Sequence, residues 1–340
     1  MNDPRILIIA PSWIGDAVLS EPLIAQIKEA HISASIDVFA PTWCLPVYRR
    51  THHIHRVIEN PLPHGALDWS LRKRIAQSLA PTLYTQAFVL PNSWKSALIP
   101  YLARIPKRTG YTGEMRFALL NDRRHLDKQM FPRLVDRFVA LAYSQDTPLD
   151  RVETTMPVLI PNMKNRKVAL ERLRLKHTSP IAVFCPGAEY GSAKRWLPEY
   201  FAELARLLLD DGMDVWLIGS PKDRAAASAI VAAVGDTSRL RDIVGQTELG
   251  DVIDLLSFAR VVISNDSGLM HIAAALDLPL VALFGSSSPT YTPPLSRHAR
   301  IANTNISCSP CFKRECPLGH FRCMRDLTPQ EVYRHVAALR

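Results

Sequence analysis

Short apolar runs rich in β-branched residues alternate with helix-like segments, and this alternation restricts the fold more than any other feature. In the N-terminal half, strands are expected at Arg5–Ala10, Ile36–Ala40 and Ala87–Leu90. Helices are expected at Leu19–Ala30, Leu71–Leu79 and Phe131–Tyr143. Strands that alternate with helices are typical of parallel βαβ units, whose sheet is covered on both faces. The pattern therefore predicts an α/β fold.

The pattern restarts after an interruption from Pro148 to Lys167, where prolines and polar residues are typical of an interdomain linker. Beyond it, strands are expected at Ile181–Cys185, Val215–Ile218, Val261–Ser264 and Leu280–Phe284. Helices are expected at Pro198–Asp211, Asp223–Val234, Leu249–Phe258, Leu269–Leu276 and Pro329–Leu339. With 340 residues, the chain is long enough for two domains. We expect two doubly wound domains, over residues 1–165 and 166–327, and a last helix in residues 328–340.

Charge is distributed unevenly in an otherwise ordinary globular composition. Lys and Arg together exceed Asp and Glu by nine. The stretch from Arg104 to Arg137 alone contains nine basic residues and four acidic ones. This excess indicates an anionic partner such as nucleic acid, a phosphorylated sugar or an acidic membrane surface; a solvated basic face would give the same count. No apolar run is long enough to span a bilayer, and no signal segment precedes the first expected strand. We expect a cytoplasmic protein.

Polar loops of unusual composition follow six of the expected strands. In parallel sheets, ligands bind beyond the carboxyl ends of the strands. These loops are Pro11–Asp16, Pro91–Lys95, Pro186–Lys194, Gly219–Asp223, Asn265–His271 and Gly285–Pro289. Their recurrence in two tandem sheets predicts a ligand site in a cleft between the domains.

The loop Asn265–His271 is the most informative of the six. A strand, a small polar turn and a helix aim backbone N–H groups at an anion, and Gly268 allows close approach to that backbone. The other interpretation is an ordinary strand–turn–helix, with Asp266 or Ser267 as the N-cap and His271 as a packed side chain.

Two further loops carry residues of the right chemistry. Asp16 follows Gly15 where a helix begins, so it is either a general base or a carboxylate stabilised by the helix dipole. Lys194 ends a loop with two glycines that suits a phosphate group; otherwise this is a solvated loop anchored by Trp196. Neither loop has the glycine spacing of a dinucleotide fingerprint or of a P-loop.

Four of the six cysteines lie close together near the C-terminus, with the spacing C-x2-C-x4-C-x6-C. Clustered cysteines bind zinc in many proteins, and reduced, partly buried thiols are the alternative. The four residues are Cys308, Cys311, Cys316 and Cys323, with His320 as a further possible ligand. The chain has no Asp-x-Asp pair to clamp a divalent metal on a diphosphate. We therefore expect neither a cofactor nor a catalytic metal.

The chain resembles the bacterial ADP-heptose:lipopolysaccharide heptosyltransferases of glycosyltransferase family 9, in family order over most of its length. VLPNSWKSAL and PGAEYGSAKRW are similar to the branch that adds the second heptose rather than the first. The matching stretches are Pro11–Ser20, Asp37–Cys44, His64–Leu67, Val89–Pro100, Arg108–Asp122, Cys185–Trp196, Asn265–Leu276 and Pro279–Ser296.

The resemblance implies a GT-B fold, in which two Rossmann-like domains face a central cleft and the last helix packs back towards the first domain. It implies transfer of L-glycero-D-manno-heptose from ADP-heptose, with inversion, to the first heptose of the lipopolysaccharide inner core. The donor would bind the C-terminal domain and the acceptor the N-terminal domain. The implied enzyme is a monomer with no transmembrane segment, peripheral to the inner face of the cytoplasmic membrane, and it binds no nucleic acid.

Site residues follow from the resemblance position by position. Asp16 matches the catalytic base, Lys194 the lysine on the donor diphosphate, and Asp223 an acidic residue near the ribose. The donor loop is matched by Asp266, Ser267, Gly268, Leu269 and His271. Acceptor carboxylates and phosphates pair well with guanidinium groups. The expected acceptor residues are Asn92, Lys95, Arg108, Arg116 and Arg123, with Arg124 beside them.

Two other functions stay open at this point. One is a GT-B transferase that uses a different nucleotide sugar. The other is a non-catalytic nucleotide or nucleic-acid binder, although the chain lacks the aromatic-interleaved basic tracts expected of single-strand binders.

Overall fold

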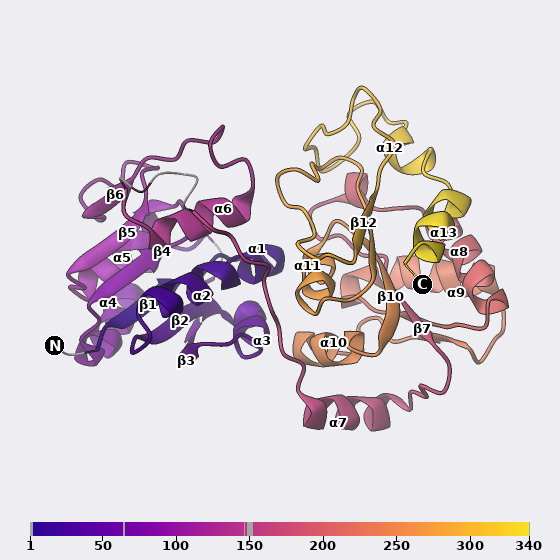
Figure 1. The fold of residues 1–340 in the computed structure, drawn as a ribbon, viewed down its shortest axis with the longest axis horizontal. Coiled ribbons are helices and arrows are strands. Elements are labelled where there is room, and N and C mark those ends of the chain that lie inside the picture. Colours follow the sequence, from indigo (N-terminus) through magenta and orange to yellow (C-terminus); the bar gives the residue numbers. More distant parts are fainter. Residues whose placement is uncertain (1–2, 64, 146, 148–151, 340) are drawn as a thin grey trace. The chain divides into compact units, whose positions relative to one another are not determined.

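The computed structural model describes residues 3–63, 65–145, 147 and 152–339. The chain divides into two compact units, Met1–Val158 and Leu159–Arg340 (Figure 1). This division falls inside the expected linker, whose residues 148–151 lie outside the described residues. It comes seven residues before the expected boundary because the backbone of Leu159 already donates to the carbonyl of Ala275, at 2.9 Å, in the second unit.

The first unit is a six-stranded sheet with helices on both faces. Its strands are β1 (Arg5–Ile9), β2 (Ser35–Pro41), β3 (Ile54–Asn60), β4 (Gln86–Val89), β5 (Lys107–Tyr111) and β6 (Asp122–Arg124). Its α-helices are α1 (Ile14–Leu19), α2 (Glu21–Ala30), α3 (Leu45–Tyr48), α4 (Trp69–Leu79), α5 (Trp94–Leu102) and α6 (Leu134–Val139). Short 3-10 turns are η1 (Thr42–Cys44), η2 (Ala80–Thr82) and η3 (Ala140–Ala142).

The second unit repeats this architecture. Its strands are β7 (Ile181–Cys185), β8 (Asp214–Leu217), β9 (Leu240–Asp242), β10 (Ala259–Asn265), β11 (Leu280–Leu283) and β12 (Ala299–Ala302). Its α-helices are α7 (Met163–Leu173), α8 (Pro198–Asp210), α9 (Arg224–Val234), α10 (Leu249–Leu256), α11 (Gly268–Ala275), α12 (Arg322–Arg325) and α13 (Pro329–Ala337). The 3-10 turns η5 (Ser192–Lys194) and η6 (Pro221–Asp223) lie in two of the strand-end loops.

Both sheets are parallel and share one strand order. The first order is β3-β2-β1-β4-β5-β6. The second is β12-β11-β10-β7-β8-β9, which becomes the same order when it is read from β9 to β12 and β7 is counted as the first strand. This is the doubly wound Rossmann order, which confirms the expected α/β architecture. The chain reverses its winding between β1 and β4 in one sheet and between β7 and β10 in the other. Loops that follow these four strands therefore mark each unit's ligand edge.

In each unit, the apolar side chains of the strands pack against helices on the two faces of the sheet. In the first unit, Leu7 and Ile9 of β1 share a buried cluster with Ala76 of α4 and Ala97 of α5. The opposite layer contains α1, α2 and α6, which contact one another. A buried apolar side chain contributes about 1.5–3 kcal/mol, so both layers stabilise the sheet.

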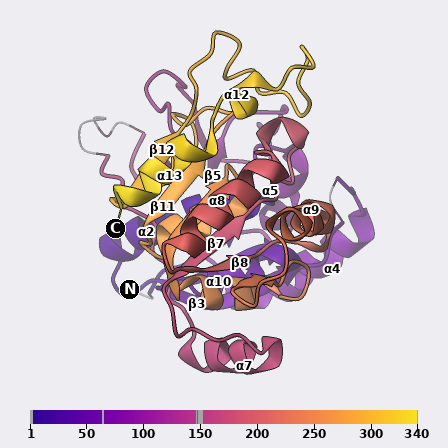
Figure 2. The same ribbon diagram turned by 90° about the vertical axis from the view of Figure 1, so that its right-hand side faces the viewer.

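In the second unit, α8, α9 and α13 cover one face of the sheet (Figure 2). Val332 and Val336 of α13 are fully buried in the same cluster as Phe201 of α8. The apolar face of this last helix lies on α8, β11 and β12 of its own unit, because its buried valines belong to this core. No helix among the described residues is long and apolar enough to cross a membrane.

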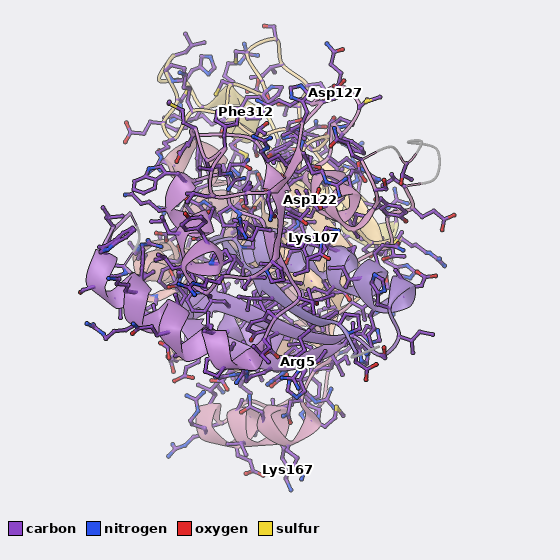
Figure 3. The ribbon with its side chains drawn as sticks, turned by 90° about the vertical axis from the view of Figure 1, so that its left-hand side faces the viewer. Arg5, Lys107, Asp122, Asp127, Lys167 and Phe312 are labelled. Atoms are coloured by element: carbon purple, nitrogen blue, oxygen red, sulfur yellow. The ribbon has the colours of Figure 1, made fainter. Side chains whose placement is uncertain are left out.

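The outer strands of the two sheets, at or next to an edge, are where expectation and structure differ most. β3, β5, β6, β9 and β12 were not expected, because their sequences are short or mostly polar. β5 and β6 carry Lys107 and Asp122, whose side chains pair at 3.5 Å (Figure 3). The expected helix Leu19–Ala30 corresponds to α2, which begins at Glu21 because Pro22 occupies its first turn; α1 ends at Leu19 just before it.

Candidate functional site

Asp16 lies in the first turn of α1, directly after the loop that follows β1. The carboxylate is partly exposed, and its negative charge adds to burial in raising the pKa of the Cys44 thiol to about 12. The loop itself is held by Trp43, whose indole N–H donates to the carbonyl oxygen of Ser12 at 2.7 Å. The structure thus places Asp16 at the ligand edge of the first sheet, on a braced loop.

A buried glutamate that the sequence did not single out lies one turn further along. Glu21 begins α2, is 4% exposed, and accepts a hydrogen bond from the backbone of Val158 at 3.2 Å. Burial raises its pKa to about 7, against the smaller lowering by that hydrogen bond. The signal for it was present in the sequence, since Ser20-Glu21-Pro22 is a helix start inside an apolar run.

The loop after β4 carries Asn92, which is exposed at the same edge. Arg116, expected to bind the acceptor, is instead 1% exposed and supports this loop from within. Its guanidinium donates to the carbonyls of Tyr111 and Pro91 and to Oδ1 of Asn92 at 3.2 Å. Burial lowers its pKa to about 10, so it stays charged at neutral pH. The Arg116 side chain therefore holds the backbone around Asn92.

The other expected acceptor residues differ in how exposed the side chain is and in how many of its donors already bond to the protein. Arg108 donates to the carbonyls of Leu119, at 2.7 Å, and Ile105, at 2.6 Å, so it also braces the backbone. Lys95 is partly exposed and donates to the carbonyl of Gly65. Arg123 is exposed on β6, whereas Arg124 next to it is buried and pairs with Asp122. The basic stretch therefore stabilises its own fold to a large extent.

In the second unit, the structure brings together two residues that lie 72 positions apart. Nζ of Lys194, at the end of the loop after β7, is 2.5 Å from Oδ2 of Asp266, directly after β10. Both side chains are largely buried, at 17% and 5% exposure. Lys194 also lies over the ring of Tyr190, 5.2 Å from its centroid. The two loops that flank the winding reversal of this sheet thus meet in one ion pair.

His271 lies behind this pair, on the first turns of α11. It is buried, and its Nδ1 has no hydrogen-bond partner among the described residues. Burial lowers its pKa to about 4, opposed by the charge of Asp266 and reinforced by that of Lys194. The imidazole is therefore neutral at physiological pH, with a ring nitrogen available for a hydrogen bond.

The turn after β10 leads directly into the N-terminus of α11. Ser267, extended at φ −150°, is the N-cap of α11, and Gly268 and Leu269 are the first residues of that helix.

The side chain of Asn265 is fully buried. It accepts a hydrogen bond from the backbone N–H of Trp196 at 3.1 Å and donates one to the carbonyl of Pro186 at 2.7 Å. This side chain clamps the Lys194 loop to β10, a role that the sequence analysis did not assign.

Asp223 completes the edge on the side of β8. Its carboxylate accepts from the backbone N–H of Ser220, at 2.9 Å, and from the Ser220 hydroxyl, at 2.8 Å, in a capping box. A side chain on Gly187 would collide with this carboxylate, so the loop after β7 needs glycine there. Asp223 therefore lies beside the loop that leads to Lys194, and it also organises the start of α9.

Two serines after β11 were missed. The hydroxyls of Ser286 and Ser287 are buried without a hydrogen-bond partner among the described residues. Buried hydroxyls are usually paired, so these two retain hydrogen-bonding capacity at the carboxyl end of β11. The only signal in the sequence was the position of Gly285–Pro289 after an expected strand.

Comparison with known proteins identifies the family. Residues 72–322 match the model of glycosyltransferase family 9 (heptosyltransferase). The chain belongs to this family. It is 42% identical to lipopolysaccharide heptosyltransferase 2 of Salmonella typhimurium and 41% identical to that of Escherichia coli K12, over 98% of each chain. The solved structure of E. coli ADP-heptose lps heptosyltransferase II matches with a TM-score of 0.89 at 39% identity, covering 98% of both chains.

Membership of glycosyltransferase family 9 confirms the family expected from the sequence, the transferase class and the GT-B architecture. Within the family, the likeness is to the heptosyltransferase 2 branch, as the VLPNSWKSAL and PGAEYGSAKRW stretches indicated.

Proposed function

We propose that this glycosyltransferase moves L-glycero-D-manno-heptose from ADP-heptose to the first heptose of the lipopolysaccharide inner core, with inversion at the anomeric carbon. The observation that carries the proposal is the likeness to E. coli ADP-heptose lps heptosyltransferase II over 98% of both chains. The expected donor residues that meet at the winding reversal of the second sheet support it.

Asp16 is the proposed general base. In an inverting transfer, the acceptor hydroxyl oxygen forms a bond to the anomeric carbon while the bond to ADP breaks. The hydroxyl proton passes to a carboxylate of Asp16, and the electron pair leaves with ADP. A positioned base contributes about 10²–10⁴-fold to such a step. Support comes from the place of Asp16, on a braced loop at the ligand edge of the first sheet.

The leaving ADP gains negative charge, and the second unit supplies groups that would stabilise it. Lys194 offers a cation, and the backbone N–H groups of Gly268 and Leu269 begin α11 with its favourable dipole. Asp266 holds the ammonium of Lys194 in place, and the neutral His271 adds a hydrogen bond without adding charge. The proposed Asp223 contact is to the donor ribose.

The proposed acceptor contacts come from exposed or partly exposed groups of the first unit: Asn92, Lys95 and Arg123. Arg116 is left out of this set because it is buried, and Arg108 because two of its guanidinium nitrogens donate to backbone carbonyls. Lys95 donates to one carbonyl and keeps two further N–H groups on its ammonium. The acceptor is a lipid, so the proposed working place is the inner face of the cytoplasmic membrane, with the enzyme as a monomer on its surface. The reaction as proposed uses no metal and no nucleic acid.

Release of ADP from ADP-heptose tests the proposal. Turnover is expected with heptosyl-Kdo2-lipid A and not with Kdo2-lipid A, which lacks the first heptose. UDP-glucose and GDP-mannose serve as control donors for a transferase with another sugar. Equal turnover on both acceptors, or preference for a control donor, would contradict the assignment.

A further inference from the structure

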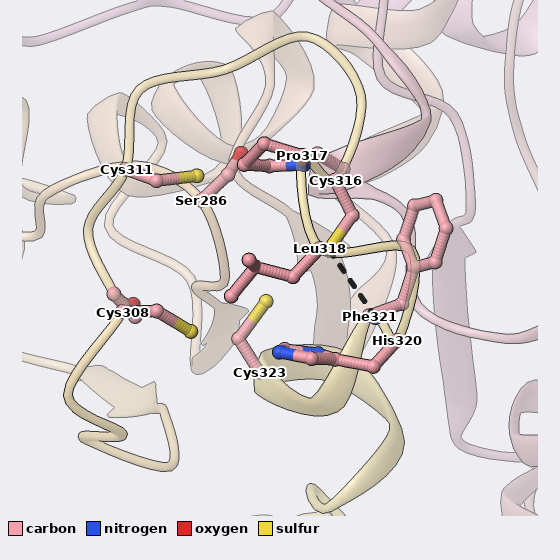
Figure 4. Close-up of a pocket in the computed structure, with 11 residues that line it drawn as sticks. Ser286, Cys308, Cys311, Cys316, Pro317, Leu318, His320, Phe321 and Cys323 are labelled. Carbon is pink, nitrogen blue, oxygen red and sulfur yellow. Dashed lines mark hydrogen bonds between the residues drawn. The ribbon is translucent and has the colours of Figure 1, made fainter.

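The proposed reaction does not use the cysteines near the C-terminus, yet the structure gathers four of them around one cavity of about 40 Å³. This cysteine cluster consists of Cys308, Cys311, Cys316 and Cys323. Figure 4 shows that all four sulfurs are directed into the cavity. The first three lie on the loop between β12 and α12, and the fourth lies on α12. None of the four is in a disulfide.

The size of the cavity limits what it holds. A cavity of this size holds water or a single ion, and it is too small for an organic ligand. The four thiols around it favour an ion. Metal sites built from four cysteine sulfurs select zinc or iron, with zinc–sulfur bonds of about 2.3 Å.

The surroundings of the cluster suit anionic sulfur. The backbone N–H of Phe321 donates to Sγ of Cys316 at 3.4 Å, drawn as a dashed line in Figure 4. Hydrogen bonds of this kind orient metal ligands from outside the first coordination shell. The segment 308–326 also carries four basic residues against two acidic ones, which offsets the net negative charge of four thiolates on a dication.

We propose that the cysteine cluster binds one thiophilic divalent metal ion, zinc or iron. In the structure as it stands, no three His, Cys, Asp or Glu side chains among the described residues are close enough to hold an ion. Binding therefore requires the four side chains to close on the metal, and the coordination stabilises the loop that carries them.

The loop of the cluster is joined directly to the proposed donor loops. The backbone N–H of Ala193 donates to the carbonyl of Arg314 at 3.0 Å, and that of Phe312 donates to the carbonyl of Ser286 at 2.7 Å. A side chain on Gly191 would collide with Arg314, so the two loops pack without space between them. The ion would thus fix the backbone next to Lys194. This second step rests on the proposed function, whereas metal binding does not.

Metal analysis of the full-length protein, purified without chelator, tests the binding step. We expect close to one equivalent of zinc or iron per chain, and the element found distinguishes the two. After chelator treatment, the wild-type protein is titrated with Co²⁺, whose absorption spectrum reports tetrahedral thiolate coordination. Absence of bound metal together with absence of that spectrum would overturn the proposal.

Variants separate the cluster from other cysteines. Cys316→Ser and Cys323→Ser are expected to lose the ion, and Cys185→Ala, which changes a buried cysteine on β7, is expected to retain it. The Co²⁺ titration uses wild-type protein, so it decides the question even if a serine variant fails to fold. Retention of the full equivalent in both serine variants would contradict the ligand assignment.

The positioning step has its own readout. Removal of the ion from wild-type protein is expected to speed amide hydrogen exchange at Ala193 and Phe312 and to weaken ADP binding by roughly tenfold, or about 1.4 kcal/mol. Faster exchange with unchanged ADP affinity would preserve the metal site and refute the link to the donor loop. Unchanged exchange would show that the ion does not hold these loops together.

Discussion

At the scale of single residues, Asp16 carries the most specific claim. Replacement by Asn keeps the shape of the side chain and removes its capacity to take a proton. Turnover is expected to fall about 10²–10⁴-fold, because general-base catalysis contributes that much. ADP affinity is expected to stay unchanged, since the proposed donor residues are on the second unit. Steady-state rates and calorimetric ADP titration measure the two effects.

The control for this variant is Asp210→Asn, the same chemical change at an exposed position on α8. It is expected to leave turnover and ADP binding as in the parent. Parental turnover of a folded Asp16→Asn protein would exclude Asp16 as the base.

Variants of the Lys194–Asp266 pair distinguish its contribution to protein stability from its contribution to ADP binding. Lys194→Met leaves the carboxylate of Asp266 buried without its cation, which destabilises a protein by about 3–5 kcal/mol for a fully buried pair and by less here. The double variant Lys194→Met, Asp266→Asn removes both charges, so melting temperature is expected to recover while ADP affinity stays low. Thermal melts and ADP titrations at low and high salt measure both quantities.

Lys167→Met is the matched control, because Lys167 forms an exposed pair with Glu171 at 4.0 Å on α7 (Figure 3). Exposed pairs contribute little, so neither melting nor ADP affinity is expected to change. The donor assignment of Lys194 would fail if the double variant bound ADP as tightly as the parent.

Glu21 makes stability depend on pH. Burial raises the pKa of Glu21 from 4.5 to about 7, so the folded state holds a proton that the unfolded state has lost. The free energy of unfolding therefore decreases as pH rises from about 4.5 to about 7, and the loss is complete above that range. Glu21→Gln cannot ionise and still accepts from Val158, so it is expected to be the more stable protein at pH 8.

The expected gain is on the order of 1–3 kcal/mol at pH 8 and near zero at pH 4. Denaturant unfolding at a series of pH values measures it. Glu29→Gln, an exposed change on the same helix, controls for the loss of one charge. If the stability gain of Glu21→Gln did not vary with pH, the pKa of Glu21 would be the same in the folded and the unfolded protein, which would contradict this prediction.

At the scale of secondary-structure elements, the central strands and their loops were predictable, because buried parallel strands appear as continuous apolar runs. β1, β4, β7, β10 and β11 all carry that signal, and the loops after them hold most of the expected donor residues. The peripheral strand β3 and the helix α7 were missed. Half of β3 faces solvent, and α7 is polar on most of its surface, so tertiary packing rather than local pattern defines them.

Charge was the least reliable guide at this scale. The basic stretch between Arg104 and Arg137 predicted a surface for anions, but a guanidinium group is also a rigid set of five donors for buried carbonyls. Arg108 and Arg116 are used in that second way. Counting charges cannot separate the two uses, because the difference depends on which carbonyls the fold leaves unpaired.

At the scale of the whole molecule, two separate cores imply two separate responses to ligands. Each unit has its own buried cluster and its own sheet, so a ligand that binds one unit stabilises that unit. The proposal assigns ADP to the second unit alone. Binding stabilises a folded unit by RT ln(1 + [L]/Kd), about 2.7 kcal/mol at 100 times Kd.

Amide hydrogen exchange with and without saturating ADP tests this division. Exchange is expected to slow in the loops after β7 and β10, within 186–196 and 266–271, because ADP would contact them and the ion pair between them. The loops after β1 and β4 are expected to exchange as before. Lys194→Met at the same ADP concentration is expected to lose most of the protection. Protection centred on Pro11–Asp16 instead would place the nucleotide on the first unit and reverse the assignment of donor and acceptor.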